Sequence, residues 1–368
     1  MNMRESWEIK RIGDVCEVLD SKRKPITKSN RQSGSIPYYG ATGIQDYVKD
    51  YIFDGRYLLV GEDGAKWGKN DNTAFIIEGK SWVNNHAHIL QLHSNVIDSF
   101  ARYYLNGKDL NSFITGAVVP KLTQAALVGI PIPVPSPEEQ ERIVAELDLL
   151  TEIIDKQKQQ LKELDNLAQA IFYDMFGSPY ANEKEWIMKP LAEIGTIVSG
   201  STPSTSDESN WDGDVNWVTP AELGVQLFYG ETRRKITSKA AKSLTIMPIG
   251  TLLMSSRAPI GKLAITSVPM CCNQGFKNIV CGNNVNNIYL YYCLMLNINS
   301  IKAMGRGATF KEVSKQVVSS FEIMLPPMNL QEPFAQKILS IEAQKQSINR
   351  SIAESQKLFD YTMDKYFG

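Results

Sequence analysis

The fold is decided by the stretch IPVPSPEEQERIVAELDLLTEIIDKQKQQLKELDNLAQAIFYDMFG, which occupies residues 132–177. Pro137 stands near the start, Glu138 and Glu139 fall in the first turn, and Gly177 follows the last apolar residue. These are the usual signals of helix ends. Apolar residues between them recur four and three positions apart over more than four heptads. The spacing predicts one helix of about 40 residues, ~60 Å long at ~1.5 Å per residue. Its seam contains Leu147, Leu150, Ile154, Leu161 and Leu164.

The same plan recurs 191 residues later, where residues 323–368 read IMLPPMNLQEPFAQKILSIEAQKQSINRSIAESQKLFDYTMDKYFG. Each copy has a proline-containing hinge, a Gln-Glu pair, a long heptad pattern and an aromatic residue followed by glycine. Two matching seams in one chain favour an intramolecular, antiparallel coiled coil over a coiled coil between two chains. The polar seam members Gln157, Lys345 and Ser355 are expected to fix its register. The second seam contains Ile338, Ile341, Ile348, Ile352 and Phe359.

The segments in front of the two helices form a second pair. Trp7 and Trp186 open them, and both contain strand-like runs, such as residues 57–60 and 252–254, between turn residues. The class is therefore α+β, with mixed, partly curved sheets and some helices. The predicted division is into domains at 1–136 and 179–326 and long helices at 137–178 and 327–368. The ends of the halves match while their interiors differ, which indicates one docking mode and two different ligands. An old duplication whose second copy merely drifted is the alternative.

Composition is that of a globular cytoplasmic protein with reduced thiols. The hydrophobic fraction is 43 % and the charged fraction 21 %, no run approaches the ~18 apolar residues of a membrane span, and the start lacks the apolar core of a signal peptide. Five cysteines without a C-x-x-C pair are expected to be free and not to bind metal. The net charge is −1, but residues 138–165 hold nine acidic and four basic residues. The remainder is weakly basic, so binding to nucleic acid would depend partly on partner chains.

Motifs for catalysis are absent or loose. A phosphate-binding loop needs G-x4-G-K-[ST], but the glycines within residues 64–69 are separated by three residues, and Asn follows the lysine. A base-gripping methyltransferase loop needs an aromatic residue after Pro-Pro, and Met follows Pro326-Pro327. Asp71 with Glu78 and Lys80 fits a metal-nuclease pattern loosely. We expect no active site and no cofactor site in this chain, with a metal-dependent DNA nuclease at those three residues as an alternative.

Several short motifs occur in the same order in both halves of the chain. In this order the chain resembles the specificity subunits of type I restriction–modification systems. Trp7 and Trp186 each precede an Ile/Leu-x-acidic-Ile/Val pattern. The second half contains GTLLMSSRAPIGK at 250–262 and CNQGFKNI at 272–279, and LPPMNLQE at 325–332 leads into the long helix. The first half departs, with GEDGAKWGK at 61–69 and VNNHAHIL at 83–90 in the corresponding places. The resemblance covers essentially the whole chain, and the departures resemble another sequence-reading subtype of the same domain.

This resemblance implies a non-catalytic, DNA-binding subunit. Each domain would read one half of a split target in the major groove, while the helix pair would set the gap and dock two methyltransferase subunits. S-adenosylmethionine, ATP and Mg would be bound by those partners and by motor–nuclease subunits. A spacer that turns two weak half-site readers into one bivalent reader agrees with this function. Two alternatives are a recognition subunit of a fused methylase–nuclease (type IIB-like) and a coiled-coil scaffold with no DNA role.

Candidate DNA contacts in the first half are basic and amide side chains near turns. Basic side chains position a protein on phosphates, and Asn or Gln can pair with adenine in the major groove. The alternative for the asparagines is hydrogen bonding within a turn, and for the basic loops a solvated surface. The candidates are Lys22, Arg23, Lys24, Lys66, Lys69, Asn84, Asn85, His86 and Lys121.

Candidate contacts in the second half follow the same logic. Arg257, beside a glycine turn, is the candidate for a bidentate guanine contact. Lys121 and Lys311 follow the repeated glycines Gly116 and Gly307 and are expected to make one equivalent phosphate contact per half. The second-half candidates are Arg233, Arg234, Arg257, Lys262, Asn273, Gln274, Lys277 and Lys311.

Overall fold

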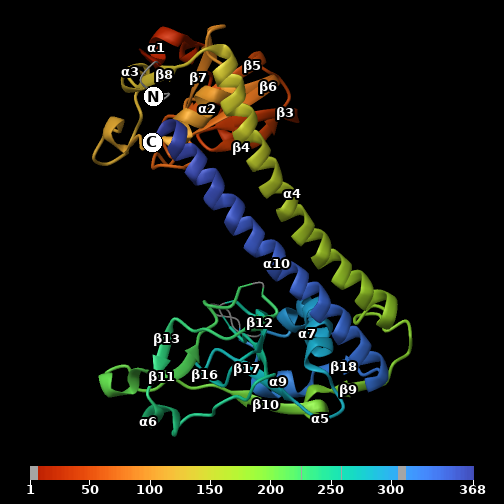
Figure 1. Ribbon diagram of the computed structural model, residues 1–368. Coiled ribbons are helices and arrows are strands. Elements are labelled where there is room, and N and C mark those ends of the chain that lie inside the picture. The colour runs from red at the N-terminus through yellow and green to blue at the C-terminus, as the bar shows by residue number, and fades with distance from the viewer. Residues whose placement is uncertain (1–6, 225, 258, 306–311) are drawn as a thin grey trace. The chain divides into compact units, whose positions relative to one another are not determined.

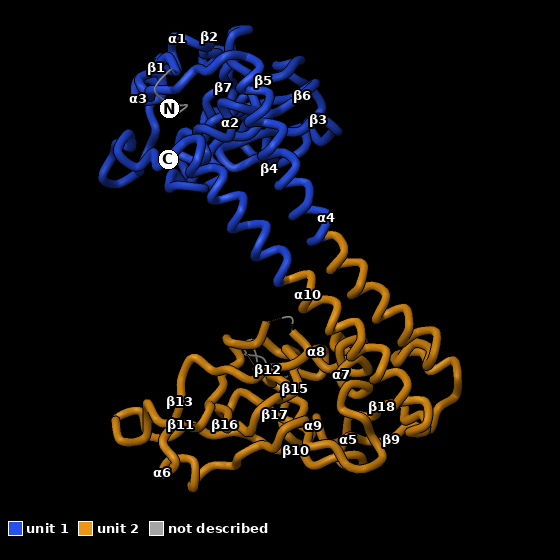
Figure 2. Tube along the Cα trace, viewed as in Figure 1, with its two compact units in different colours: residues 1–158, 350–368 blue, residues 159–349 orange. Residues whose placement is uncertain are grey.

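The computed structural model describes residues 7–224, 226–257, 259–305 and 312–368. They form two compact units, coloured separately in Figure 2: unit 1 is Met1–Lys158 with Arg350–Gly368, and unit 2 is Gln159–Asn349. The two long helices are α4 (Pro137–Phe176) and α10 (Met328–Phe367) (Figure 1). Each helix is divided between the two units, so that one part of it belongs to unit 1 and the rest to unit 2. The predicted α+β class with two repeated domains and two long helices is confirmed. The finer boundaries at residues 136, 178 and 326 stay a prediction.

Unit 1 is built on a six-stranded sheet that is antiparallel except where β3 meets β6. Alternate residues of β5 face opposite cores: Leu58 and Val60 pack with Phe100 of α2, and Leu59 packs with Ile89 on the other face. A separate antiparallel ribbon joins β1 to β8. The strands of the sheet, in spatial order, are β2 (Cys16–Val18), β7 (Ala87–Leu92), β5 (Phe53–Gly61), β6 (Ala74–Val83), β3 (Ser33–Gly40) and β4 (Gly43–Val48). The remaining elements are β1 (Glu8–Arg11), β8 (Pro131–Val134), α1 (Ile12–Val15), α2 (Asp98–Gly107), α3 (Gln124–Val128) and the 3-10 turns η2 (Asp20–Lys22), η3 (Lys28–Asn30) and η4 (Asn111–Phe113).

Unit 2 contains a five-stranded and a three-stranded sheet, with a two-stranded ribbon of β9 and β18. The five-stranded sheet has the order β10 (Gly195–Ser199), β17 (Lys277–Cys281), β14 (Leu252–Met254), β15 (Leu263–Thr266) and β12 (Phe228–Tyr229). The three-stranded sheet has the order β13 (Arg234–Ile236), β11 (Trp211–Val218) and β16 (Met270–Cys272). The remaining elements are β9 (Met188–Pro190), β18 (Glu322–Met324), α5 (Leu191–Ile194), α6 (Ser238–Ala241), α7 (Asn287–Leu296), α8 (Ile298–Ala303), α9 (Lys315–Ser320) and the 3-10 turn η5 (Glu208–Asn210).

The sequence repeat is a repeat of topology. In unit 1, β3 runs parallel to the end of β6, with Tyr39 opposite Val83. In unit 2, β11 runs parallel to β16, with Val218 opposite Cys272. The antiparallel pair β2·β7 likewise has its counterpart in β10·β17, and the ribbon β1·β8 in β9·β18. Positions in the two units can therefore be matched by their backbone pairing as well as by sequence.

The long helices pair in antiparallel fashion inside each unit, as predicted. In unit 1, Gln157 of α4 donates to the Ser351 hydroxyl of α10 at 2.7 Å. In unit 2, Lys345 of α10 forms an ion pair with Asp165 of α4 at 2.8 Å. Two of the three polar seam members, Gln157 and Lys345, thus bind across the seam, which is the contact expected of residues that fix register. All ten seam residues named from the sequence are buried or half-buried. Among the described residues, no helix is both long and apolar enough to cross a membrane.

Aromatic side chains fasten the end of each long helix to a domain. In unit 2, Phe176 at the end of α4 packs edge to face on Tyr289 and Phe334, with ring centroids 5.0 and 5.3 Å apart. In unit 1, Phe367 at the end of α10 packs on Phe100 and Tyr104 at 5.5 and 5.7 Å. Each domain therefore holds the beginning of one long helix and the end of the other.

A buried glutamine fixes the beginning of each long helix. Gln140 is fully buried, accepts from the Ile97 amide at 2.8 Å, and donates to the carbonyls of Asn95 and Pro135 at 3.0 and 2.9 Å. Gln331, 191 residues later, is also fully buried; it accepts from the Asn286 amide at 2.8 Å and donates to the carbonyls of Asn284 and Pro326 at 3.2 and 2.7 Å. One side-chain amide in each unit thus joins the hinge, the helix and the loop before the domain's own helix.

We predict that Gln331→Ala lowers the free energy of unfolding by about 2–3 kcal/mol, because it leaves buried backbone groups without partners. Denaturant unfolding measures the loss, and amide hydrogen exchange at Asn286 should accelerate because its acceptor is gone. The matched control is Gln160→Ala, an exposed glutamine of α4, which should change stability by less than ~0.5 kcal/mol. Equal stability of the two variants would contradict this function of Gln331.

Candidate nucleic-acid interface

Several predicted contact residues of unit 1 are brought together by loops at one end of the sheet. The Arg23 guanidinium, just after η2, donates to the carbonyls of Asn85 and Ala87 at 3.3 and 2.9 Å. The His86 ring contacts the Asp63 carboxylate, and Asp63 pairs through its backbone with Lys121. The 22–24 loop, the turn after β5, the β6–β7 turn and the segment at Lys121 therefore form one polar surface. Its exposed members include Lys22, Lys24, Asn85 and His86.

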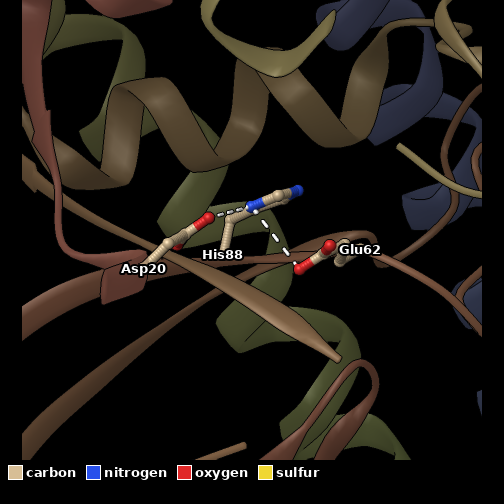
Figure 3. Close-up of side chains that lie close together, drawn as sticks. All are labelled: Asp20, Glu62 and His88. Carbon is tan, nitrogen blue, oxygen red and sulfur yellow. Dashed lines mark hydrogen bonds and ion pairs between the residues drawn. The ribbon is translucent and has the colours of Figure 1, made fainter. Parts of the chain in front are cut away.

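Behind this surface lies a charge network, which we call the anchor network: Asp20, Arg23, Glu62, His88 and Lys121. Its members are largely buried except Lys121, whose side chain is 40 % exposed. Figure 3 shows His88 between the two carboxylates, with Nδ1 2.5 Å from Asp20 Oδ2 and 3.8 Å from Glu62 Oε2. Its Nε2 lies 2.7 Å from the Leu122 carbonyl. Arg23 contacts both carboxylates, and Lys121 Nζ lies 2.6 Å from Glu62 Oε1. Buried charges persist in proteins when they are paired in this way.

The spacing of Asp20, Glu62 and His88 would also suit a metal ion, since their ligand atoms all lie within 4.8 Å of one another. The donors are already engaged, however. Arg23 and Lys121 neutralise the carboxylates, and both His88 nitrogens face oxygen atoms of the chain. The arrangement is that of a closed ion-pair network.

Two predicted contacts in unit 1 already have partners within the chain. Arg23 is only 14 % exposed at its side chain, and its charge is satisfied by Asp20 and Glu62, so it is not a free phosphate contact. Asn84 is 2 % exposed; it donates to Gln45 at 3.1 Å and accepts from the His86 amide at 2.8 Å. The alternative interpretation, hydrogen bonding within a turn, therefore holds for Asn84. Asn85 beside it is exposed.

Unit 2 places a corresponding group of residues at the matched position. Asn273 accepts from the Gly275 amide at 2.9 Å, the same turn that Asn84 makes in unit 1. Gln274 is exposed, and its carbonyl oxygen accepts from Thr202 at 2.6 Å. Arg257, half-buried, pairs through its backbone with Glu312. Lys277 is 8 % exposed, with its ammonium 3.5 Å from Glu312. Lys277 is thus a buried ion-pair partner in this structure, and its contact with DNA stays a prediction.

The remaining candidates lie apart from these groups. Arg233 and Arg234 are exposed near β13, where the Arg234 guanidinium stacks over Trp211 at 3.6 Å. Lys262 lines a cavity of about 360 Å³ between β15, α7 and the long helices of unit 2. Lys66 is exposed, whereas Lys69 is ion-paired with Asp364 of α10. Lys311 lies outside the described residues.

The predicted equivalence of Lys121 and Lys311 is wrong by one position. The amide of Leu122 donates to the Glu62 carbonyl at 2.8 Å, and in unit 2 the amide of Val313 donates to the Ser256 carbonyl at 3.0 Å. Lys121 precedes Leu122 as Glu312 precedes Val313, so Glu312 is the counterpart of Lys121. The residue types at this position are opposite in charge. One shared phosphate contact per half is therefore not supported by the repeat.

The nuclease alternative is not favoured by the geometry. Asp71 accepts from the Gly68 amide at 2.7 Å within a turn, Glu78 pairs with Arg56 at 3.1 Å, and the Lys80 ammonium lies 4.6 Å from the centre of the Tyr51 ring. Each side chain has its own partner, as a surface residue does.

All five cysteines are free, and four are buried. Burial, with a smaller contribution from Asp20, raises the pKa of Cys16 to about 12, and burial raises the pKa of Cys271 to about 11. Such thiols are protonated at neutral pH, which makes them poor nucleophiles and poor metal ligands.

Sequence reasoning missed the acids that hold the site: Asp20, Glu62 and Asp63. Carboxylates repel phosphates, so residue type alone does not indicate them as part of a DNA-binding surface. A signal was present, because the turn at 61–69 begins with adjacent acids and His88 of β7 follows His86 by two residues. Buried acids beside basic loops predict paired charges, but the pairing across loops depends on tertiary structure.

The fold and the two matched polar surfaces define a duplicated, two-part recognition protein. The family model for the type I restriction modification DNA specificity domain matches residues 4–166 and, in a second copy, residues 183–355. The chain belongs to this family.

Relatives and solved structures agree with this assignment. The chain is 28 % identical over 375 residues to a putative type I restriction enzyme specificity subunit, S.HindORF215P, of Haemophilus influenzae, covering 96 % of this chain and 93 % of the relative. It is 39 % identical over 158 residues to the type I restriction enzyme MjaIX specificity subunit of Methanocaldococcus jannaschii, covering 41 % and 37 %. The fold is similar to the type I restriction-modification S subunit from M. genitalium, with a TM-score of 0.63, 12 % identity and coverage of 99 % and 96 %. A chain from a structure on complex assembly and conformational transition of the type I R-M system gives a TM-score of 0.58 at 20 % identity, covering 98 % and 97 %.

The neighbours Asn84 and Asn85 provide a test of the interface. Asn84→Ala should lower the free energy of unfolding by about 1–3 kcal/mol, because the Gln45 and His86 groups lose a buried partner. Asn85→Ala should change stability by less than ~0.5 kcal/mol and instead weaken discrimination among DNA sequences. Thermal unfolding and competitive DNA binding of both variants separate the two effects, and a reversed outcome would refute the assignment.

Proposed function

We propose that this chain is the DNA-reading subunit of a type I restriction–modification complex and is itself non-catalytic. Each unit reads one half of a split target in the major groove. The observation that carries the proposal is the repeat of one topology around two different polar surfaces: Asn85 and His86 in unit 1, Arg257 and Gln274 in unit 2. A shared scaffold with different exposed side chains is suited to two half-targets of different sequence.

The charge of the chain supports a dependence on partners. The net charge is −1, and several basic residues, including Arg23, Lys121, Lys277 and Lys345, are already paired with acids. Phosphate neutralisation supplies much of the affinity of DNA-binding proteins. The chain as a whole carries no net positive charge for this purpose, so we infer that partner subunits provide much of the grip on the backbone.

The long helices offer a repeated surface for two copies of one partner. Leu167 of α4 and Leu358 of α10, which are 191 residues apart, are 48 % and 51 % exposed. In unit 2, Leu167 borders a groove of about 560 Å³ between the helices, which Leu164 and Ile348 also line. Exposed apolar residues at matched positions suit two equivalent docking sites for the same partner. We propose that two methyltransferase subunits bind there, carrying S-adenosylmethionine, and that motor–nuclease subunits add ATP- and Mg-dependent cleavage in the cytoplasm.

The function is tested by mapping N6-methyladenine in a host that carries this gene and its methyltransferase gene, with and without this gene. We expect a split motif with one modified adenine in each half, which disappears on deletion. Exchange of residues 179–326 for the matching segment of a relative should then alter one half only. Methylation patterns that do not change on deletion would count against the proposal.

The docking surface is tested by Leu167→Arg and Leu358→Arg. A charge placed in an apolar contact is costly to bury, so each variant should bind one methyltransferase subunit and the double variant none, as measured by native mass spectrometry. Lys158→Ala, an exposed polar change on the same helix pair, is the matched control and should retain both. Two bound subunits on the double variant would place the interface elsewhere.

A further inference from the structure

The anchor network joins four chain segments of unit 1 that are far apart in sequence: residues 20–23, Glu62, His88 and Lys121. Asp20 accepts from the Ile89 amide at 3.0 Å as well as contacting His88, so it ties η2 to β7. Glu62 binds Arg23 and Lys121, which lie 39 residues before it and 59 after it. The segments held in this way are those that carry the exposed Lys22, Asn85 and His86.

Unit 2 uses different chemistry at the matched positions. The Glu62 amide donates to the His86 carbonyl, and the Ser256 amide donates to the Gly275 carbonyl, both at 2.8 Å. Ser256 is therefore the counterpart of Glu62. By strand register, Lys277 of β17 is the counterpart of His88 of β7, and Glu312 is that of Lys121. Among the described residues of unit 2, Lys277 takes the central place, with its ammonium 3.4 Å from the Ser256 hydroxyl and 3.5 Å from Glu312.

We infer that the anchor network is a positioning device for base selectivity, in which Glu62 and His88 hold the reading loops of unit 1 without touching DNA, while Lys277 and Glu312 do so separately in unit 2. The inference rests on the proposed DNA-reading function and assigns its selectivity to residues outside the contact surface. It also implies that the two half-targets depend on two independent sets of ion pairs.

The physical reason is that base readout depends on the placement of loops. A bidentate contact to a base edge has strict geometry, whereas a contact to phosphate tolerates movement. Removing one partner of a buried ion pair leaves the others uncompensated, so the local structure rearranges. Loss of Glu62 would remove the ion pair of Lys121 and one of the two ion pairs of Arg23, and so would loosen the 22–24 loop and the β6–β7 turn. Selectivity for one half-target should therefore fall more than total affinity does.

The experiment uses the full chain in complex with its methyltransferase partner, on duplexes that carry the methylome-derived target or single-base changes in either half. For Glu62→Gln we expect discrimination to fall about tenfold for changes in one half, the size of one lost base contact, and to stay at the wild-type level in the other. Glu62→Asp, which keeps the charge, should restore part of the loss. Lys277→Met should produce the reciprocal pattern, with the other half affected.

The sign of the effect separates positioning from simple electrostatics. Glu62→Gln removes a negative charge, so through-space attraction alone would leave discrimination intact and raise affinity for all duplexes equally. That result would overturn the inference, as would an equal loss in both halves. Wild-type discrimination at the other half-target shows that the variant chain is folded and assembled with its partner. If Glu62→Gln were too unstable to assemble, Lys121→Met, at a side chain that is 40 % exposed, breaks the same ion pair. Through-space electrostatics alone would then lower affinity for all duplexes equally, whereas loss of positioning lowers discrimination in one half.

Failure of the inference is distinguishable from failure of the proposed function. If the wild-type complex methylates no split motif, the function itself is wrong. If the wild type reads a split motif and the Glu62, Lys121 and Lys277 variants all read it with unchanged discrimination, the function stands and the positioning device does not.

Discussion

The arrangement of this chain depends on one buried side-chain amide, used twice. Gln140 and Gln331 each make three hydrogen bonds to backbone groups and so fix where a long helix leaves its domain. A buried amide with its partners in place is rigid because every alternative leaves unpaired polar groups. The start of each helix is therefore determined by its domain, and the polar seam contacts at Gln157 and Lys345 then align the two helices.

Much of this fold could be predicted from the sequence because its strongest signals are periodic or repeated. The heptads of residues 132–177 and 323–368 indicated the long helices, and the repeat required a second copy of whatever the first copy formed. The Gln-Glu pairs were visible in the same alignment, but their hydrogen bonds were not, since the partners Asn95 and Asn284 lie 45 and 47 residues away. Periodicity reports which face is buried and does not report which polar groups meet there.

The candidate interface was harder to predict, for a physical reason. Residue type indicates what a side chain can do, but exposure and charge pairing decide whether it is available. Lys22, Asn85 and Gln274 are exposed as a contact requires, whereas Asn84 and Lys277 are buried by turns and ion pairs. The matching of Lys121 with Lys311 departed by one residue from the 191-residue offset of the repeat, which places Lys121 opposite Glu312. The backbone hydrogen bonds of Leu122 and Val313 agree with that offset.

The division of α4 and α10 between the units has a consequence for synthesis on the ribosome. Unit 2 is contiguous, from Gln159 to Asn349, whereas unit 1 also needs Arg350–Gly368. Phe367 packs on Phe100 and Tyr104 of a domain translated more than 250 residues earlier. Domains of a nascent chain generally fold as units, the first-made first; here the order is inverted. The core of unit 1 stays incomplete until the last turns of α10 have left the ribosome. Premature termination within these turns would therefore destabilise the unit that was synthesised first.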